Sequence, residues 1–420
     1  MATRTYIADK ETLDAVKANT DGILAAVGTE NEKTGWKRYG VKINTLDSNP
    51  ETRCEYIFDA VGMEPAGMDF TNGAFDYGDW GDNWMVTGNY PVMLKYDGTV
   101  DYKLDPNDYS KKLDGTASDY NITTYEGNVM ARIPKAYLAN YTVGNYEYIV
   151  FCEHRYDESY HTYPFTREDG TEMDCFYSSV YHGYNDGTRM RSISGVQPTT
   201  SLSGTTELAL AQANGDLWYT KTWAQRNHIN CLLILLGKST NTQAVYGQGN
   251  STGYDAESET KGILQTGMLD QSGQFWGSSA TTSQVKIFHI ESYWGDVWDR
   301  IAGLMMKDGT IRAKMTPPYN TTADGYADTG ISPTGTSGSY IKACASDPVF
   351  GILPNSTGGS SSTYFPDYFY YSETATTYAL VGGSCSYGSG CGGSALFLSF
   401  SVSYPYWYIG SSLSCEQPAA

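Results

Sequence analysis

Apolar residues recur at helical spacing near the start of the chain. Five positions between residues 13 and 27, one of them a threonine, are separated by three and four residues: Leu13, Val16, Thr20, Ile23 and Val27. Asp9 or Thr12 is suited to cap such a helix. The pattern fits a short coiled coil, but it covers barely two heptads and fits an ordinary amphipathic helix as well. We interpret residues 1–34 as a helix for oligomerisation or attachment.

Two more helices are predicted in the second half of the chain. Residues 205–215 (TTELALAQANG) fit a short helix that starts at a Ser or Thr cap. Residues 222–239 (TWAQRNHINCLLILLGKS) fit a longer one, ended by Gly237 with Lys238 in its last turn. His228 lies in the apolar part of this helix, so it is interpreted as a core residue rather than as a metal ligand.

Short strands and long loops account for most of the remaining pattern. Apolar and polar residues alternate in VKINTL, CEYIFDAV and PVMLKYDGTVDYKL, which makes residues 35–130 a strand-rich middle section. IPKAYLANYTVGNYEYIVFCEH reads as two strands joined by a glycine turn, and QVKIFHIESYW as a later strand. Loops rich in Gly, Ser, Thr and Asn separate these runs. Helices among many short strands predict an α+β fold.

Composition narrows the classes of partner. The chain of 420 residues has a net charge of -19, which argues against nucleic acid and anionic membranes; the same acidity would also simply keep a large particle component in solution. The 36 tyrosines are a large excess, and tyrosine is favoured in binding surfaces. The N-terminus lacks the features of a signal peptide, and the longest apolar run, Cys231 to Leu236, is too short for a bilayer. We therefore expect a soluble protein made in the cytoplasm, with no membrane insertion.

No residue pattern predicts a metal or a cofactor. The eight cysteines include no CxxC pair and are expected to be free, buried thiols. Cys152 and His154 lie close in sequence, but a zinc site needs a second pair of ligands, which is missing. Asp296 and Asp299 lack the spacing of a calcium loop, and we interpret them as part of a structural turn.

The C-terminal stretch carries the clearest motif. From Gly382 to Cys415 it reads GGSCSYGSGCGGSALFLSFSVSYPYWYIGSSLSC. This resembles the variable region of proteins targeted by diversity-generating retroelements, which include phage tail adhesins similar to the major tropism determinant. The positions that match the fixed skeleton of such regions are Gly388, Ser389, Cys391, Gly392, Leu398, Trp407, Ile409, Gly410 and Leu413. Cys385 departs from the pattern, because relatives often have Trp there.

Upstream stretches extend the resemblance to residues 131–415. IPKAYLANY, MRSISGVQPT, WAQRNHINCLLILLGKST, KIFHIESYWGDVWDRIAGL and MTPPYN look like phage tail proteins with a C-type lectin fold of the formylglycine-generating-enzyme type. The resemblance implies a C-type lectin-like domain over 131–420 with a variable region at about 382–415. It also implies a homotrimer at the virion tail tip or fibre, attached to other phage tail components. Its partner would be a bacterial cell-surface receptor, either protein or glycan.

The variable stretch has a composition that fits adenine-directed mutagenesis. In this family such mutagenesis of Asn codons never yields Lys, Glu, Gln, Met or Trp. The first four are absent from Ser386 to Tyr408, and the one Trp, Trp407, falls at a fixed skeleton position. A buried, apolar strand pair would also lack charges. If residues 396–402 and 404–409 are strands, Trp407 and Ile409 face the core and three tyrosines lie side by side outside. The predicted binding face is Ser386, Tyr387, Gly390, Phe397, Ser399, Ser401, Tyr404, Tyr406 and Tyr408, with Phe400 assigned to the core by position and to the face by the family pattern.

Other functions remain open at this point. One alternative is a bacterial or prophage-encoded ligand-binding protein that has the same variable region. Another is a purely structural tail component, which would be favoured if residues 382–415 were buried. An enzyme of the formylglycine-generating type needs a reactive cysteine pair, and Cys385 and Cys391 are the only close one. A glycan-cleaving enzyme needs two acidic groups, and none occurs from Thr374 to Ser414. We therefore expect a binding protein and not an enzyme.

Overall fold

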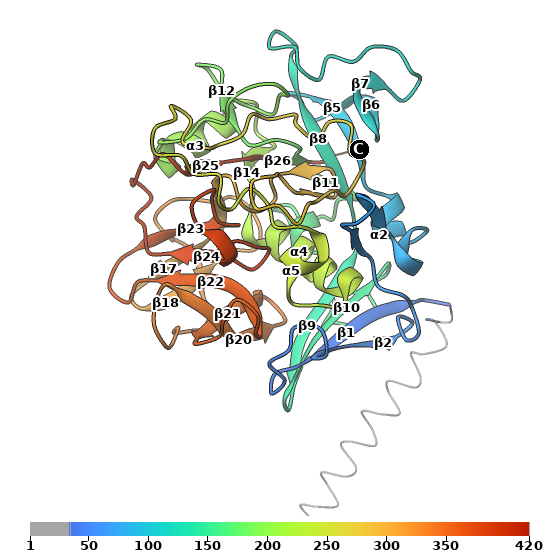
Figure 1. Cartoon of the computed structure of the whole chain (residues 1–420), viewed down its shortest axis with the longest axis vertical. Coiled ribbons are helices and arrows are strands. Elements are labelled where there is room, and N and C mark those ends of the chain that lie inside the picture. Colours follow the sequence, from blue (N-terminus) through green and yellow to red (C-terminus); the bar gives the residue numbers. More distant parts are fainter. Residues whose placement is uncertain (1–32, 34, 420) are drawn as a thin grey trace, which may run out of the picture.

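The computed structural model describes residue 33 and residues 35–419. The predicted N-terminal helix of residues 1–34 lies almost wholly outside the described residues. The described chain is mostly β-structure with few helices, arranged around the long helix α4 (Figure 1). No helix in this part of the protein is both long enough and apolar enough to cross a membrane.

Three sheets form the framework. The four-stranded sheet has the order β2-β1-β10-β9, with bounds Cys54–Phe58, Arg38–Asn44, Tyr146–Cys152 and Tyr137–Val143. The seven-stranded sheet has the order β14-β26-β11-β8-β5-β6-β7, with bounds Trp218–Thr220, Leu413–Glu416, Cys175–Ser179, Gly127–Pro134, Tyr90–Lys95, Val100–Asp105 and Asp108–Lys112. Both sheets combine strands from before and after residue 130, so the expected boundary at that residue does not separate two sheets.

The nine-stranded sheet is built from the last third of the chain. Its order is β19-β18-β17-β23-β24-β22-β20-β21, with β25 paired to β17. The bounds, in chain order, are β17 Trp298–Lys307, β18 Thr310–Ala313, β19 Ala327–Asp328, β20 Ser339–Asp347, β21 Gly351–Thr357, β22 Phe365–Tyr371, β23 Thr377–Val381, β24 Leu396–Leu398 and β25 Ile409–Ser411. Three small pairs complete the strands: β3 Gly67–Asp69 with β4 Ala74–Asp76, β12 Tyr184–Asn185 with β13 Met190–Arg191, and β15 Lys286–Ile287 with β16 Ile290–Glu291.

Helix α4, Trp223–Gly237, starts at a reciprocal cap: the Thr222 hydroxyl accepts from the Gln225 amide, and the Gln225 side chain accepts from the Thr222 amide. It ends at Gly237, as predicted. Lys238 does not lie in the last turn; it is the C-cap, with a left-handed φ of 49°. A side chain at position 237 would meet the Val245 side chain at 2.8 Å, so glycine is required there by close packing.

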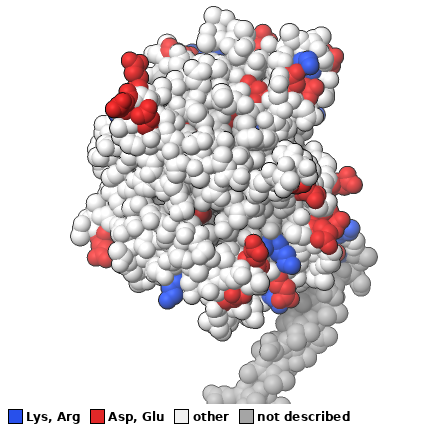
Figure 2. All heavy atoms as spheres, in the orientation of Figure 1, with Lys and Arg blue, Asp and Glu red and all other residues white. Residues whose placement is uncertain are grey.

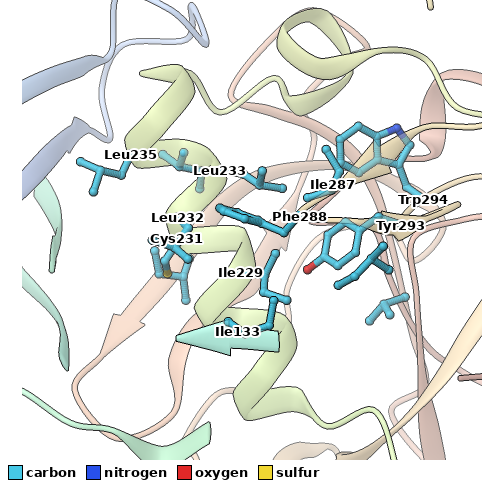
Figure 3. Close-up of a cluster of buried hydrophobic side chains, with 14 of the residues drawn as sticks. Ile133, Ile229, Cys231, Leu232, Leu233, Leu235, Ile287, Phe288, Tyr293 and Trp294 are labelled. Atoms are coloured by element: carbon cyan, nitrogen blue, oxygen red, sulfur yellow. The ribbon is translucent and has the colours of Figure 1, made fainter. Parts of the chain in front are cut away.

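The sequence of α4 is apolar around most of its circumference, and the structure buries it on nearly all sides. Figure 3 shows Ile229, Leu232 and Leu233 of α4 beside residues of β8 and of the 287–294 segment. One apolar cluster around this helix joins side chains of all three sheets, including Val41, Ile133 and Leu396. The sheets therefore share a single core.

The other helices among the described residues are short. They are α2 Trp84–Thr87, α3 Gly204–Gln212 and α5 Thr242–Tyr246, with 3-10 turns η2 Gly78–Trp80, η3 Tyr163–Phe165 and η4 Gly388–Gly390. Helix α3 confirms the predicted short helix, and Ser203 caps it by accepting from the Thr206 amide. The strand predicted over residues 284–294 is instead a hairpin of β15 and β16, because Phe288 and His289 turn the chain with positive φ.

Candidate binding surface

The C-terminal stretch from Gly382 to Cys415 contains less β-strand than the sequence predicts. Only Leu396–Leu398 is a strand in the predicted 396–402 run, and residues 399–408 form a loop that leads into β25. Strand β24 lies between β22 and β23 in the middle of the nine-stranded sheet. The alternation of side chains predicted for 404–409 is therefore replaced by a loop conformation, although the tyrosines still reach the surface.

Two residues of the predicted face are buried. Phe397 is only 4% exposed and packs against Tyr370 and Trp298, with ring centroids 4.5 and 5.6 Å apart. The reason is that β24 is covered on both faces, so alternation along the strand does not separate core from surface. Gly390 is also buried, because the Tyr368 ring lies over it, 2.8 Å from where a Cβ would stand.

The other predicted residues lie at the surface to different degrees. Ser386, Ser401 and Tyr406 are exposed, and the half-buried members are Tyr387, Ser399, Phe400, Tyr404 and Tyr408. Trp407, expected in the core, is only half-buried and stacks on exposed Tyr254 at 4.9 Å. Phe400 occupies both expected roles, since its ring packs on buried Phe397 at 4.3 Å and remains partly exposed.

The exposed and half-buried rings form one continuous patch. We call it the aromatic surface and define it as Tyr340, Tyr368, Tyr370, Tyr387, Phe400, Tyr404, Tyr406 and Tyr408. Along the 399–408 loop, Phe400 stacks on Tyr404 at 4.1 Å, Tyr404 on Tyr406 at 5.7 Å, and Tyr406 meets Tyr408 edge-on at 4.5 Å. Aromatic pairs at such separations attract one another beyond their area burial.

The patch continues from the loop onto the sheet. The Tyr408 and Tyr387 hydroxyls are 3.4 Å apart, and the Tyr387 ring lies 5.9 Å from that of Tyr370. Tyr370 leads to Tyr368 at 5.8 Å, and Tyr368 meets Tyr340 edge-on at 4.4 Å. Segments far apart in the sequence thus build one surface.

Sequence reasoning missed the sheet half of this surface. In β22 the half-buried Tyr368 and Tyr370 alternate with buried Asp367, Phe369 and Tyr371. This period of two is visible in the sequence PDYFYY and could have marked both tyrosines as surface residues. Tyr340 and Tyr254 carry no comparable signal, because only tertiary packing brings them to the patch.

The backbone of the 399–408 loop is held by the framework. Every second carbonyl from residue 400 to residue 408 accepts a hydrogen bond from a residue outside the loop. The pairs are Phe400 with the Tyr378 amide (2.9 Å), Val402 with the Gly204 amide (2.7 Å), Tyr404 with the Arg300 guanidinium (2.8 Å), Tyr406 with the Ser201 amide (3.1 Å) and Tyr408 with the Trp298 amide (2.9 Å). None of these bonds uses a side chain of the loop, so all five remain possible when the side chains of the loop change.

Arg300 is itself fixed by buried partners. Its guanidinium pairs with Glu207 of α3 at 2.5 Å and donates to the Leu202 carbonyl at 3.1 Å. Burial raises the pKa of Glu207 to about 7, and the neighbouring Arg300 opposes that rise. The guanidinium therefore has a fixed position from which it holds the Tyr404 carbonyl.

Charge is absent from the aromatic surface. No Lys, Arg, Asp or Glu occurs from Thr374 to Ser414, and Figure 2 shows a broad face of the molecule with charged groups mainly near its margins. Asp367 lies beneath Tyr368 but is buried, accepts from the Ser394 amide at 2.7 Å, and has its pKa raised by burial to about 7. Burial also raises the pKa of Tyr370 to about 12, so its hydroxyl stays protonated at neutral pH.

The geometry does not provide a reactive thiol pair. All eight cysteines are free and buried, as predicted. Burial raises the pKa of Cys385 to about 12 and that of Cys391 well above its ordinary value. Both thiols are thus protonated at neutral pH, whereas a nucleophilic cysteine needs a lowered pKa.

A metal site is not apparent in the part of the chain that the structure describes, where no three His, Cys, Asp or Glu side chains gather around one point. Asp296 lies in a turn with φ 63°, and its carboxylate accepts from the Leu264 amide at 2.9 Å and the Asn250 amide group at 2.7 Å. These bonds assign Asp296 a structural role.

Comparison with known proteins gives a limited result. No protein-family model matches the sequence, and no curated protein does. Among solved structures, the chain is similar to the Major Tropism Determinant P3c variant, with 12% identity and a TM-score of 0.28 over 78% of this chain and 71% of that one. The I1 variant gives 12% identity and a TM-score of 0.30, and the U1 variant 13% and 0.29, each over 78% of this chain and 72% of the other. Similarity at this level does not by itself establish a shared function.

Proposed function

We propose that this chain is a receptor-binding protein of a phage tail and that its aromatic surface binds a molecule on the surface of a bacterial host. One observation carries the proposal: the rings stand on a loop whose backbone is held from outside by hydrogen bonds to alternate carbonyls. Such a loop keeps its shape while its side chains change, which a diversified binding surface requires. The resemblance of residues 382–415 to retroelement variable regions supports the same function.

The finer parts of the proposal follow from that resemblance. The C-terminal region is a C-type lectin-like domain of the formylglycine-generating-enzyme type, and the diversified positions are the exposed and half-buried members of the predicted binding face. The variable face then consists of Ser386, Tyr387, Ser399, Phe400, Ser401, Tyr404, Tyr406 and Tyr408. The exposure of Ser401 and Tyr406 argues against a purely structural tail component.

Self-association belongs to this function. A flat patch of half-buried rings binds weakly when it acts alone, but several copies on one particle increase avidity by about 10²–10⁴ when they engage together. A homotrimer joined through residues 1–34 would supply those copies.

The function is tested by removing the three late tyrosines together. In Tyr404→Ala/Tyr406→Ala/Tyr408→Ala we expect adsorption to host cells to be lost, because most of the exposed ring area of the loop disappears. Thermal stability should fall by only a few degrees, because the loop backbone keeps its framework hydrogen bonds. Binding of labelled protein to cells and thermal unfolding measure the two effects.

Tyr146→Ala is the matched control. Tyr146 is 37% exposed, close to the 38% of Tyr406, but it lies on β10 in the four-stranded sheet. Its replacement should leave adsorption unchanged. Undiminished adsorption by the triple variant would refute the proposed function, and cooperative unfolding at a far lower temperature would show that the three rings are part of the core.

A further inference from the structure

The side chains of the aromatic surface and its border offer mainly two kinds of chemical group, aromatic rings and hydroxyls. All of its members except Phe400 are tyrosines, and serines border it at positions that include Ser386, Ser389 and Ser401. The Tyr340 hydroxyl, for example, hydrogen-bonds the Ser389 hydroxyl at 2.6 Å. A ligand that fits must therefore combine flat apolar faces, which stack on the rings, with many hydroxyl groups that donate and accept hydrogen bonds.

Charged ligand groups would find no counter-charge among the members of the aromatic surface. Arg300, beneath the loop, is engaged by Glu207 and two carbonyls, and Asp367 is buried and accepts from the Ser394 amide. A phosphate, carboxylate or ammonium group placed on the rings would lose water without compensation.

The border of the surface beside Trp407 is mainly acidic. Tyr254, which stacks on Trp407, is followed by three exposed carboxylates, Asp255, Glu257 and Glu259. One cation lies among them, Lys261, whose ammonium is 5.8 Å from the centre of the Trp407 ring. None of the three carboxylates takes part in a salt bridge with another described residue. Together with the net charge of -19, they repel anionic polymers such as those with uronate or phosphate groups.

Two hollows among the described residues lie away from the aromatic surface. One of about 230 Å³ lies beside Trp36 and His154, and one of about 320 Å³ lies beside Asn49 and Thr363. Protein partners are usually anchored by large side chains that fill pockets. A row of rings at 4.1–5.9 Å spacing instead suits an extended chain of flat, repeated units.

We infer that the ligand of the aromatic surface is an uncharged saccharide chain and that Tyr340, Tyr368 and Tyr370 of β20 and β22 bind it together with the 399–408 loop. This inference rests on the proposed function and specifies its receptor. The sheet tyrosines lie outside residues 382–415, so they form an unvarying half of the surface beside the diversified half. Sugar rings stack through their C–H faces on the tyrosine rings, while sugar and tyrosine hydroxyls exchange hydrogen bonds.

The first experiment identifies the class of receptor. Labelled full-length protein is screened on a panel of bacterial strains, and cells of a strain that it binds are treated with periodate, which cleaves sugar diols, or with proteinase K. We expect periodate to abolish binding, proteinase K to leave it unchanged, and added NaCl to have little effect, because no charge pairs form. Loss of binding only after proteinase K, or strong weakening by salt, would overturn the uncharged saccharide. Absence of binding to every strain would instead refute the proposed function.

The second experiment tests the sheet half of the surface on the same cells. Tyr368→Ala should weaken binding about tenfold through loss of one stacking ring, whereas Tyr368→Phe, which keeps the ring, should weaken it less. Tyr340→Ala provides a second variant should Tyr368→Ala fold poorly, and Tyr146→Ala is the control. Wild-type binding by folded Tyr368→Ala and Tyr340→Ala proteins would show that β20 and β22 do not contribute.

Discussion

At the scale of single residues, His228 is a polar side chain that lies buried in the apolar core. It is 1% exposed, and neither ring nitrogen has a hydrogen-bond partner. Its ring instead meets Phe151 and Phe165 edge-on at 5.2 and 5.1 Å. The prediction that it is a core residue is confirmed, but it is a core residue without satisfied nitrogens. Burial accordingly lowers its pKa from 6.5 to about 3.

This burial makes the fold sensitive to acid through one side chain. Below pH 6.5 the unfolded chain protonates His228 while the native protein does so only near pH 3, so stability is lost as the pH falls through that window. We expect His228→Leu to remove this loss. Relative to wild type, its free energy of unfolding should improve by about 2 kcal/mol between pH 7 and pH 5.

Urea unfolding at the two pH values measures the effect. His154→Leu, which replaces an exposed imidazole, is the control. If acidification destabilises His228→Leu as much as the wild type, the native protein must already protonate His228 at pH 5.

At the scale of elements, the 399–408 loop and the turn before β24 differ in whether they have room for a larger side chain. Ser401 is exposed in a loop held through its carbonyls, so a larger side chain meets no obstacle. Gly392 has a φ of 147°, and a Cβ there would stand 2.1 Å from the Asp367 carboxylate. The first position is free to vary and the second is not, which agrees with the match of Gly392 to the fixed skeleton.

A pair of substitutions tests this contrast. Ser401→Tyr should change the free energy of unfolding by less than about 0.5 kcal/mol, as is usual for surface sites. Gly392→Ala should cost more than about 1 kcal/mol, because of both the backbone conformation and the clash. Denaturant unfolding of both proteins gives the comparison. Similar losses in the two variants would contradict the division into a tolerant loop and a fixed skeleton.

The elements that the sequence predicts correctly are those marked by nearby residues, such as a helix cap or a glycine in a turn. Helices α3 and α4 each begin after a capping residue, whose side chain accepts a hydrogen bond from the amide three residues later. The turn between β9 and β10 contains Gly144, which has positive φ. Phe397 was misplaced because alternation indicates a surface only when one face of a strand is open. Tyr340, a member of the aromatic surface, and Tyr254, which stacks on Trp407 at its border, escaped prediction because contacts between distant segments bring them there.

At the scale of the whole molecule, the three sheets share one core around α4, so the aromatic surface rests on a rigid body. The assembly of several such bodies is assigned to residues 1–34, which lie almost entirely outside the described part of the structure. The homotrimer therefore stays a prediction that the resemblance to phage tail proteins implies, and the apolar seam that contains Ile23 is the segment to which we assign it.

Sedimentation of the full chain tests that prediction. We expect a mass of three protomers for the wild type and of one for Ile23→Asp, because a charge in the seam opposes its burial. Adsorption to cells should fall by about 10²–10⁴ with the loss of avidity. Lys17→Asp, a change outside the seam, should remain trimeric. A monomeric wild type would contradict the assigned role of this segment.

The position of β26 in the sheet has a consequence for truncated forms of the chain. This strand follows the 399–408 loop in the chain, yet it lies inside the seven-stranded sheet, between β14 and β11. A stop codon or frameshift within residues 386–408 would remove β26, so that β14 would lose its partner strand in this sheet and β11 would keep only β8. We expect such truncated chains to misfold. Only a chain translated in frame as far as Glu416 can complete the seven-stranded sheet, whatever side chains residues 386–408 carry.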